Sequence, residues 1–250
     1  MASLIQRHST NQADVREAVL AGLDISSAKN VLDLGCGFGF MAEAIASRVA
    51  PEAHFTGVDV WQSNALPFCR KVLSTGRRAS FTCMQIGSKL PWPGGSFDLV
   101  SSSYALYFFA EVLPDIARVL TPEGLFVSVT HSERSLVDLL CMAGLPEAGS
   151  RWTKLMRGFS AENGEALLER HFGEVRRIDY HNALKFTPET AGDLMTFIQF
   201  KLQLLSPESN PQNHPPEALR RFVEEVLPCM GEVVVEKNDA AFHCRRPRCH

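Results

Sequence analysis

Three glycines spaced one residue apart follow a short apolar run, and this spacing suits a backbone turn that lies close to a ligand. Gly35, Gly37 and Gly39 follow residues 31–34 and precede the small apolar segment 41–49. A glycine has no Cβ, so its backbone can approach a bound group and adopt conformations that other residues avoid. The start of a helix also offers unpaired backbone N–H groups. The sequence therefore predicts a ligand-binding turn between a strand and a helix.

An acidic residue stands at the end of the next β-prone segment. Asp59 lies 24 residues after Gly35, within the run HFTGVDV at 54–60. A carboxylate at that place can accept hydrogen bonds from both ribose hydroxyls of an adenosine group. Phe40 occupies the position at which a GxGxxG motif has its third glycine, which disfavours a nicotinamide or flavin dinucleotide. The pattern favours another nucleoside-containing cofactor.

Strand-like and helix-like segments alternate around this turn. Strands are expected at 31–34, 54–60, 80–86, 97–102 and 125–130, and helices at about 13–23, 41–49, 65–73 and 113–120. Further strands are expected at 175–180 and 232–244. This alternation predicts a Rossmann-like α/β fold, with a doubly wound, mostly parallel seven-stranded sheet and helices on both faces.

The second half of the chain departs from this repetition. After Thr130, helices are expected at 136–143, 160–172, 187–205 and 219–226, with a loop at 206–216. Leu194, Phe197, Leu202 and Leu205 fall on one helical stripe. We predict a single domain over 1–250, with a core at about 28–181 and 231–246 and a helical cap insertion at 182–230. Such an insertion would close a pocket over a small substrate.

Composition excludes several classes of protein. The formal net charge is −3, from 25 basic and 28 acidic residues, so no overall field attracts nucleic acid or an anionic membrane. No apolar run approaches the roughly twenty residues of a membrane span. The chain has 7 cysteines and no recognisable signal peptide, which favours reduced thiols and a cytoplasmic location. His243, Cys244, Cys249 and His250 lack the paired spacing of a zinc site, and no metal is predicted.

Four motifs in order carry a family resemblance. VLDLGCGFGF, GVD, LPWPGGSFDLV and ARVLTPEGLFV, across about residues 28–130, resemble the class I S-adenosylmethionine-dependent methyltransferases. The resemblance implies S-adenosylmethionine as cofactor. It places Gly35 and Gly37 against the methionine part, Asp33 near the amino group, and Asp59 on the ribose.

The resemblance also suggests where the adenine lies. Val60 and Trp61 would lie beside the ring, although Trp61 is equally compatible with a core position. The family often has a carboxylate after the third strand that accepts the adenine amino hydrogen, and Ile86 stands there in this chain. Gln85, Ser88 or a backbone carbonyl would have to accept that bond, or packing alone holds the ring.

Methyl transfer from a sulfonium is an in-line displacement that depends mainly on alignment and exclusion of water. Where the acceptor needs a base, His131 after the fifth strand is the first candidate. Ser102 and Tyr104 follow the fourth strand, where donor and acceptor should meet. The sequence thus predicts a methyltransferase for a small organic molecule. Two alternatives remain: a non-catalytic binding or assembly module, and a nicotinamide-dependent oxidoreductase.

Overall fold

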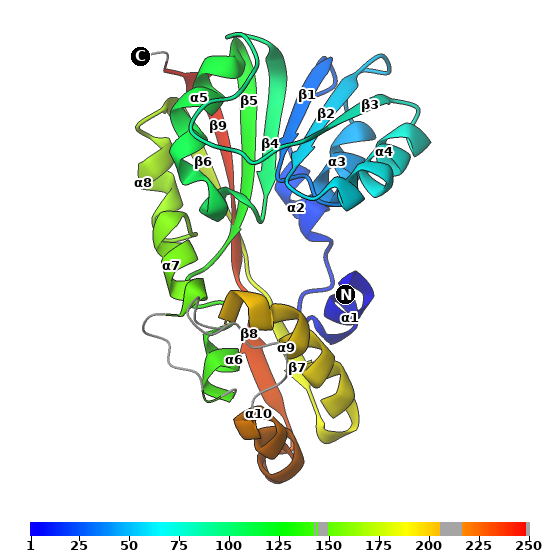
Figure 1. Ribbon diagram of the computed structural model, residues 1–250, viewed down its shortest axis with the longest axis vertical. Coiled ribbons are helices and arrows are strands. Elements are labelled where there is room, and N and C mark those ends of the chain that lie inside the picture. The colour runs from blue at the N-terminus through cyan, green and yellow to red at the C-terminus, as the bar shows by residue number, and fades with distance from the viewer. Residues whose placement is uncertain (143, 145–149, 206–216, 249–250) are drawn as a thin grey trace. The chain divides into compact units, whose positions relative to one another are not determined.

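A computed structural model describes residues 1–142, 144, 150–205 and 217–248 (Figure 1). The contacts divide the chain into two compact units. The small unit comprises Met1–Ala13, His131–Arg157 and Tyr180–Asp239, and the sheet unit comprises Asp14–Thr130, Gly158–Asp179 and Ala240–His250. The predicted loop at 206–216, together with Cys249 and His250, lies outside the described residues. In the part of the chain that the structure describes, no helix has the length and apolarity of a membrane span.

A seven-stranded sheet organises the sheet unit, in the order β3-β2-β1-β4-β5-β9-β6. The strands are β1 (Asn30–Leu34), β2 (His54–Asp59), β3 (Arg78–Cys83), β4 (Phe97–Ser103), β5 (Leu120–His131), β6 (Phe172–Tyr180) and β9 (Asp239–Pro247). Central β1 pairs in parallel with β2 and β4, and the pairs β2–β3 and β4–β5 are also parallel. Residues 31–34 are fully enclosed, which explains why this strand is continuously apolar except for Asp33. The predicted mostly parallel α/β fold is confirmed.

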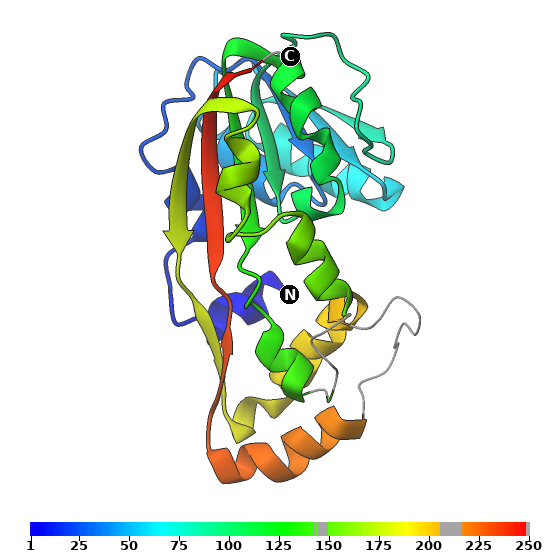
Figure 2. The same ribbon diagram turned by 90° about the vertical axis from the view of Figure 1, so that its left-hand side faces the viewer.

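Helices cover both faces of the sheet (Figures 1 and 2). They are α2 (Val15–Leu20), α3 (Phe40–Ala46) and α4 (Ala65–Ser74) on one face, and α5 (Leu113–Val119) and α8 (Gly164–Leu168) on the other. Phe68 and Val72, one turn apart on α4, are fully buried in a core with Ile45 of α3 and Phe55 of β2. Pro114 stands in the first turn of α5, where its missing N–H costs little.

The last part of the sheet unit differs from two predictions. The helix expected at 160–172 is shorter in the structure, where α8 spans Gly164–Leu168 and β6 already begins at Phe172. The strand expected at 232–244 is two strands, β8 (Val233–Glu236) and β9, interrupted at Lys237 and Asn238. The interruption separates a strand of the small unit from one of the large sheet.

The small unit combines helices with a two-stranded sheet. Its helices are α1 (Ala2–His8), α6 (Val137–Met142), α7 (Arg151–Gly158), α9 (Ala191–Leu205), α10 (Glu217–Arg221) and α11 (Leu227–Met230), with a π-helical turn over Phe222–Val226. The last residue of α7, Gly158, is grouped with the sheet unit. Strand β7 (Ala183–Phe186) pairs antiparallel with β8. The expected all-helical insertion at 182–230 therefore also contains a strand. Four residues in which Leu184 and Phe186 are buried and the other two are not give too short a pattern to stand out beside long helical stripes.

The first helix belongs to this small unit. His8 bonds through Nε2 to Asp193 Oδ2 at 2.7 Å and through Nδ1 to the Lys185 carbonyl at 2.9 Å. Its ring also packs 4.5 Å from the Phe186 ring. The small unit thus gathers residues 1–13 and 131–157 in addition to the predicted insertion, and the single-domain organisation over 1–250 stays a prediction.

Candidate functional site

The glycine turn links β1 to α3 and has a strained backbone that only glycine adopts freely. Gly35 and Gly39 have φ angles of +66° and +82°. A Cβ on Gly35 would lie only 2.3 Å from the Cβ of Ala105, so any side chain there would collide. A Cβ on Gly37 would have no atom within 4 Å. The turn is therefore closed by packing at Gly35 and open at Gly37, where the backbone is accessible to a ligand.

Asp59 is held against this turn by backbone hydrogen bonds. The Gly37 N–H donates to Asp59 Oδ2 and the Trp61 N–H donates to Oδ1, each at 2.9 Å. Asp59 closes β2 and is 9% exposed. A carboxylate has about four lone-pair sites, so two remain for other donors. This arrangement suits a ligand that offers two hydroxyl groups.

Asp33 is the second carboxyl group near the turn, and it is buried within β1. Ser101 Oγ donates to its Oδ1 at 2.7 Å. Burial raises the pKa of Asp33 to about 7, the Ser101 hydrogen bond lowers it, and the negative charge of Asp59 adds to the rise. Binding of a cationic group would stabilise the ionised form. The neighbouring Cys36 is no nucleophile, because burial raises the pKa of its thiol far above neutrality.

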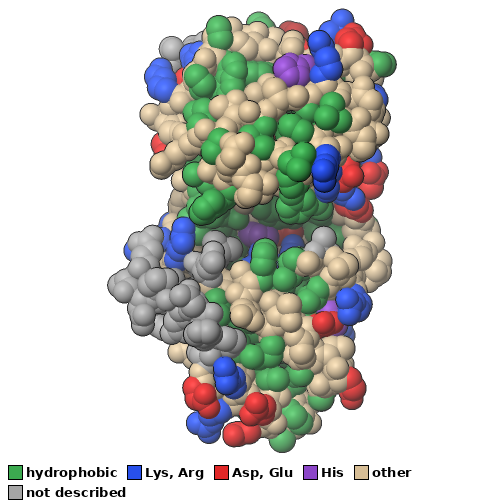
Figure 3. Space-filling model, turned by 45° about the vertical axis from the view of Figure 1, so that its right-hand side comes forward, with side chains coloured by type: hydrophobic (Ala, Val, Ile, Leu, Met, Phe, Trp, Pro, Cys, Tyr) green, Lys and Arg blue, Asp and Glu red, His purple; other side chains and the backbone are tan. Residues whose placement is uncertain are grey.

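Hydrophobic side chains reach the surface of the sheet unit (green in Figure 3). Phe38, Val60 and Trp61 are 49%, 55% and 68% exposed, and all three lie beside the glycine turn or Asp59 in the sequence. The alternative that Trp61 is a core residue is therefore wrong. Ile86 is only 8% exposed and offers an apolar surface where the family often has a carboxylate. These residues can pack on an aromatic base without hydrogen-bonding it.

Ser102 and Ser103 at the end of β4 have different environments. Ser102 is fully buried and its Oγ donates to the Leu34 carbonyl at 3.0 Å, which ties β4 to β1. Its side chain therefore bonds to the backbone just before the glycine turn. Its predicted contact with the cofactor stays a prediction. Ser103 Oγ is inaccessible to solvent and has no hydrogen-bond partner among the described residues. A hydroxyl left in this state is costly, so a bound group that pairs with it would gain affinity.

Tyr104 occupies a strained position directly after these serines. Its φ is +56°, which is rare for a residue with a bulky side chain. The Tyr104 N–H donates to the Val129 carbonyl at 2.8 Å and so fixes the chain between β4 and β5. Such strain persists only where the surroundings enforce it, and it is common at functional sites. The predicted role of Tyr104 in substrate orientation is compatible with this geometry.

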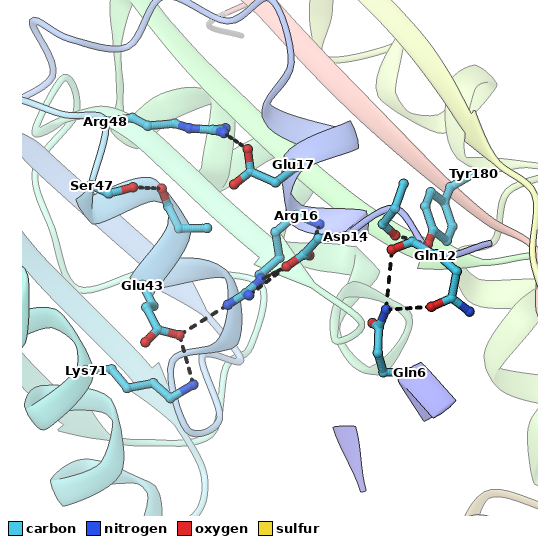
Figure 4. A network of polar contacts seen from close by, with 12 residues as sticks. Gln6, Gln12, Asp14, Arg16, Glu17, Glu43, Ser47, Arg48, Lys71 and Tyr180 are labelled. Atoms are coloured by element: carbon cyan, nitrogen blue, oxygen red, sulfur yellow. Dashed lines mark hydrogen bonds and ion pairs between the residues drawn. The ribbon is translucent and has the colours of Figure 1, made fainter. Parts of the chain in front are cut away.

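The rim of the glycine turn is held by a charged network (Figure 4). Arg16 of α2 pairs with Asp14 and, at 3.2 Å, with Glu43 of α3, and Glu43 also accepts from Lys71. Arg16 lies 5.0 Å from the centre of the Phe40 ring, and Lys71 lies 4.8 Å from that of Phe38. The pairs are partly exposed and contribute little stability each. Their effect is to order the two aromatic residues that flank Gly39.

His131, the predicted base, ends β5 and is grouped with the small unit. Its Nδ1 bonds to Asp239 Oδ1 at 2.6 Å, and the residue is 4% exposed. Burial lowers the pKa of His131 to about 4, against the opposing effect of Asp239. The neutral ring therefore donates Nδ1–H to Asp239 and has its lone pair on Nε2, which is the form that accepts a proton. The sequence identified His131 but gave no sign of Asp239, which lies 108 residues away.

We expect His131 to make stability depend on pH. Its pKa lies below the ordinary 6.5, so the unfolded chain binds a proton that the folded chain excludes between about pH 6.5 and 4. Stability should therefore fall over this window as pH is lowered. Thermal unfolding of wild type and His131→Asn across the window checks this, because the variant should lose that component of the decline. The exposed His181→Asn variant should retain the wild-type slope, and equal slopes for all three proteins would contradict the assignment.

His243 and Cys244 lie in β9. They belong to the group of four residues whose spacing did not favour a zinc site. Both residues are buried, and His243 Nε2 bonds to the Val19 carbonyl at 2.7 Å. The hydrogen bond from the ring to α2 explains why a histidine occupies this strand. The other two residues of that group are not described.

Comparison with known proteins agrees with this geometry. Residues 31–124 match the model of a methyltransferase domain family. The chain is 30% identical to a demethylmenaquinone methyltransferase of Symbiobacterium thermophilum over 109 residues, which is 42% of this chain and 43% of that protein. It is 29% identical to the enzyme of the same name from Geobacillus kaustophilus over 124 residues, 48% of this chain and 53% of that one. The chain thus spans about half the length of the curated relatives it matches.

Two solved structures share the fold of the chain. A candidate methyltransferase from Bacillus halodurans C-125 superposes with a TM-score of 0.58 at 17% identity, covering 94% of this chain and 99% of that one. The [4+2]-cyclase SpnF gives a TM-score of 0.52 at 18% identity, covering 92% and 80%. At these identities the likeness concerns the fold alone, and the cyclase shows that this fold also occurs in a protein named for other chemistry. Residues 31–124 therefore resemble a methyltransferase domain, and the mostly parallel sheet that contains them is the fold that this resemblance implies.

Proposed function

We propose that this protein transfers a methyl group from S-adenosylmethionine to a small organic molecule. The observation that carries the proposal is Asp59, fixed at the end of β2 by the N–H groups of Gly37 and Trp61. The cofactor supplies an electrophilic methyl group on a positively charged sulfur. The protein has to bind this group, orient an acceptor and exclude water.

The residues of the sheet unit fit such a cofactor. Asp59 has unused lone pairs for the ribose hydroxyls, and Asp33 is a carboxyl group that a cationic amino group would ionise. Gly37 leaves room for close approach, and Ser103 has an unsatisfied hydroxyl at the end of β4. Val60 and Trp61 offer exposed apolar surface for the base.

For an acceptor that must lose a proton, we propose His131 as the base. The Asp239 carboxylate orients its ring and stabilises the imidazolium that forms when Nε2 takes the proton. An acceptor that attacks without losing a proton needs only orientation, and Tyr104 is proposed to contribute to it. His131→Gln should lower the rate of methylation of the first kind of acceptor while leaving cofactor affinity unchanged.

The acceptor class is supported by the curated relatives. Both matched relatives are named as demethylmenaquinone methyltransferases, which favours a small organic acceptor over a polymer. The near-balanced charge of the chain supports the same choice. We place the protein in the cytoplasm, because a reducing compartment suits the free thiols of the described cysteines.

Titration of the purified protein with S-adenosylmethionine and with NADH tests the proposal. We expect saturable binding of the first and much weaker binding of the second. Tighter binding of NADH would support an oxidoreductase instead. Absence of binding to both, with the biological role unchanged in Asp59→Ala, would support a non-catalytic module.

The protonation of Asp33 should make cofactor affinity depend on pH. With a pKa of about 7, much of this carboxyl group is neutral below neutrality and must ionise to pair with the cationic amino group of the cofactor. Affinity measured by calorimetry should therefore rise several-fold from pH 6 to pH 8. Asp33→Asn should bind more weakly with a flat profile. An unchanged affinity across this range in wild type would contradict the role of Asp33.

A further inference from the structure

The small unit encloses a cluster of ionisable side chains that the proposed cofactor site does not use. Lys201 comes from α9, Lys237 and Asp239 from the junction of β8 and β9, and His131 from the end of β5. Their exposed fractions are 9%, 8%, 3% and 4%. Charged groups are seldom buried to this degree unless they are paired or have a function.

Asp239 is fully engaged within the cluster. Its Oδ1 accepts from His131 Nδ1 at 2.6 Å and its Oδ2 accepts from Lys237 Nζ at 2.8 Å. Burial would raise the pKa of this carboxyl group, but the positive charge of Lys237 and the contacts with His131 hold it well below its ordinary value. Asp239 is therefore an anion whose charge Lys237 balances.

The positive charge of Lys201, in contrast, is not paired with a carboxylate among the described residues. No hydrogen bond or ion pair within that part of the chain reaches its ammonium group, and the ring of Phe200 lies 5.6 Å away. Burial, aided by the charge of Lys237, lowers the pKa of Lys201 to about 8, so the group is mostly cationic at neutral pH. With His131 neutral, two ammonium groups face one carboxylate. The described cluster carries one excess positive charge.

This excess charge stands close to the surface. Phe200, beside the Lys201 ammonium, is itself 58% exposed. Dispersion and cation–π contacts with one exposed ring recover only part of the hydration that Lys201 loses. An anionic ligand that reaches Lys201 would supply the missing charge in a place where water screens it little.

We propose that Lys201 binds an anionic oxygen of a small organic molecule, either a carboxylate or an ionised hydroxyl. Lys237 and Asp239 act as positioning residues, because their ion pair keeps Asp239 from neutralising Lys201. The ligand would then be an acid or an acidic phenol or enol, and its neutral analogues would bind poorly.

The test measures anion binding without the methyl donor, so it does not depend on methyltransferase activity. Acetate, benzoate and 4-nitrophenolate at neutral pH serve as probes, with acetamide and benzamide as uncharged controls. We expect at least one anionic probe to bind the wild type and to bind Lys201→Met at least about tenfold more weakly. Lys201→Arg should recover part of the affinity. Preference for benzoate or for phenolate distinguishes a carboxylate from an ionised hydroxyl.

Lys185→Met is the matched control, because this exposed lysine of β7 pairs with Glu232 in the same unit. It should bind the anions as the wild type does. Equal binding by Lys201→Met, or no anion binding by the wild type, would overturn the proposal. Normal anion binding together with no S-adenosylmethionine binding would instead refute the proposed function and leave the anion site standing.

A stability measurement separates a ligand site from a structural lysine. Without ligand, removal of an unbalanced buried charge should raise the melting temperature of Lys201→Met by at least about 2 °C. Lys185→Met should change it little. A clearly lower melting temperature for Lys201→Met would show that the ammonium group supports the fold, and the proposal would fail.

Discussion

Replacement of Asp59 with alanine should weaken S-adenosylmethionine binding at least about a hundredfold, because two hydrogen bonds to a charged acceptor are lost together. The carboxylate is only 9% exposed and is already fixed by two backbone N–H groups, so a ligand need not order it. Calorimetric titration of wild type and variant measures the change. The same substitution should also loosen the glycine turn, since Gly37 and Trp61 lose their acceptor.

Asp98 offers a matched control for this loss of backbone hydrogen bonds. Its Oδ2 accepts the N–H groups of both Lys29 and Asn30 at 2.9 Å, at the opposite end of the strands from the glycine turn. Asp98→Ala should lower stability in a similar way but leave cofactor affinity within about twofold. If both variants lose affinity equally, the effect of Asp59 is structural. If Asp59→Ala binds normally, the proposed cofactor site is wrong.

A second pair of substitutions should separate the structural glycine of the turn from the binding glycine. Gly35→Ala places a Cβ 2.3 Å from that of Ala105 at a φ of +66°, so we expect it to lower the free energy of unfolding by about 3 kcal/mol or more. Gly37→Ala meets no atom within 4 Å and adds only the strain of its positive φ, about 1 kcal/mol. Denaturant unfolding measures both values.

We expect Gly37→Ala, although it costs less stability than Gly35→Ala, to have the larger direct effect on cofactor binding. Gly37→Ala is expected to stay folded and to lose S-adenosylmethionine affinity, because its methyl group enters the space that the ligand would approach. Gly76→Ala is the control, since it has a φ of +81° and equally open surroundings at the end of α4. It should lose similar stability and bind normally. Normal binding by Gly37→Ala would show that the ligand does not approach this backbone.

Local pattern was enough to predict the larger part of the fold. The apolar run at 31–34, the glycine turn and the helix at 65–73 each result from interactions within a few residues, or from burial that the pattern itself records. The mostly parallel sheet was predictable because βα repetition leaves few topologies open. The short strand β7 was missed, because its identity as a strand depends on its partner β8, which is far away in the sequence: Phe186 pairs with Val233 and Ala183 with Glu236.

The features of the candidate site likewise fall into those that could be predicted from sequence and those that depend on the tertiary structure. The sequence by itself was enough to predict Gly35, Gly37 and Asp59 as site residues, since a turn without side chains and an acid at the next strand end form a local signature. Only the tertiary structure decided that Asp33 has a pKa near neutrality, that Ser102 faces Leu34 and that Trp61 is exposed. These properties depend on desolvation and on neighbours from other strands, which no local pattern contains.

The same reason applies to the cluster of Lys201, Lys237, Asp239 and His131. In the sequence, His131 is a histidine after a strand and Lys201 is a lysine on an apolar helix, and nothing connects them. Folding brings their charges together in a place that water barely reaches, where one unbalanced charge acquires a large energy. From sequence alone, the glycine turn and Asp59 predict a nucleoside-containing cofactor, and the resemblance carried by the four motifs implies that it is a methyl donor. The anion site that we propose depends on charges that only the tertiary fold brings together.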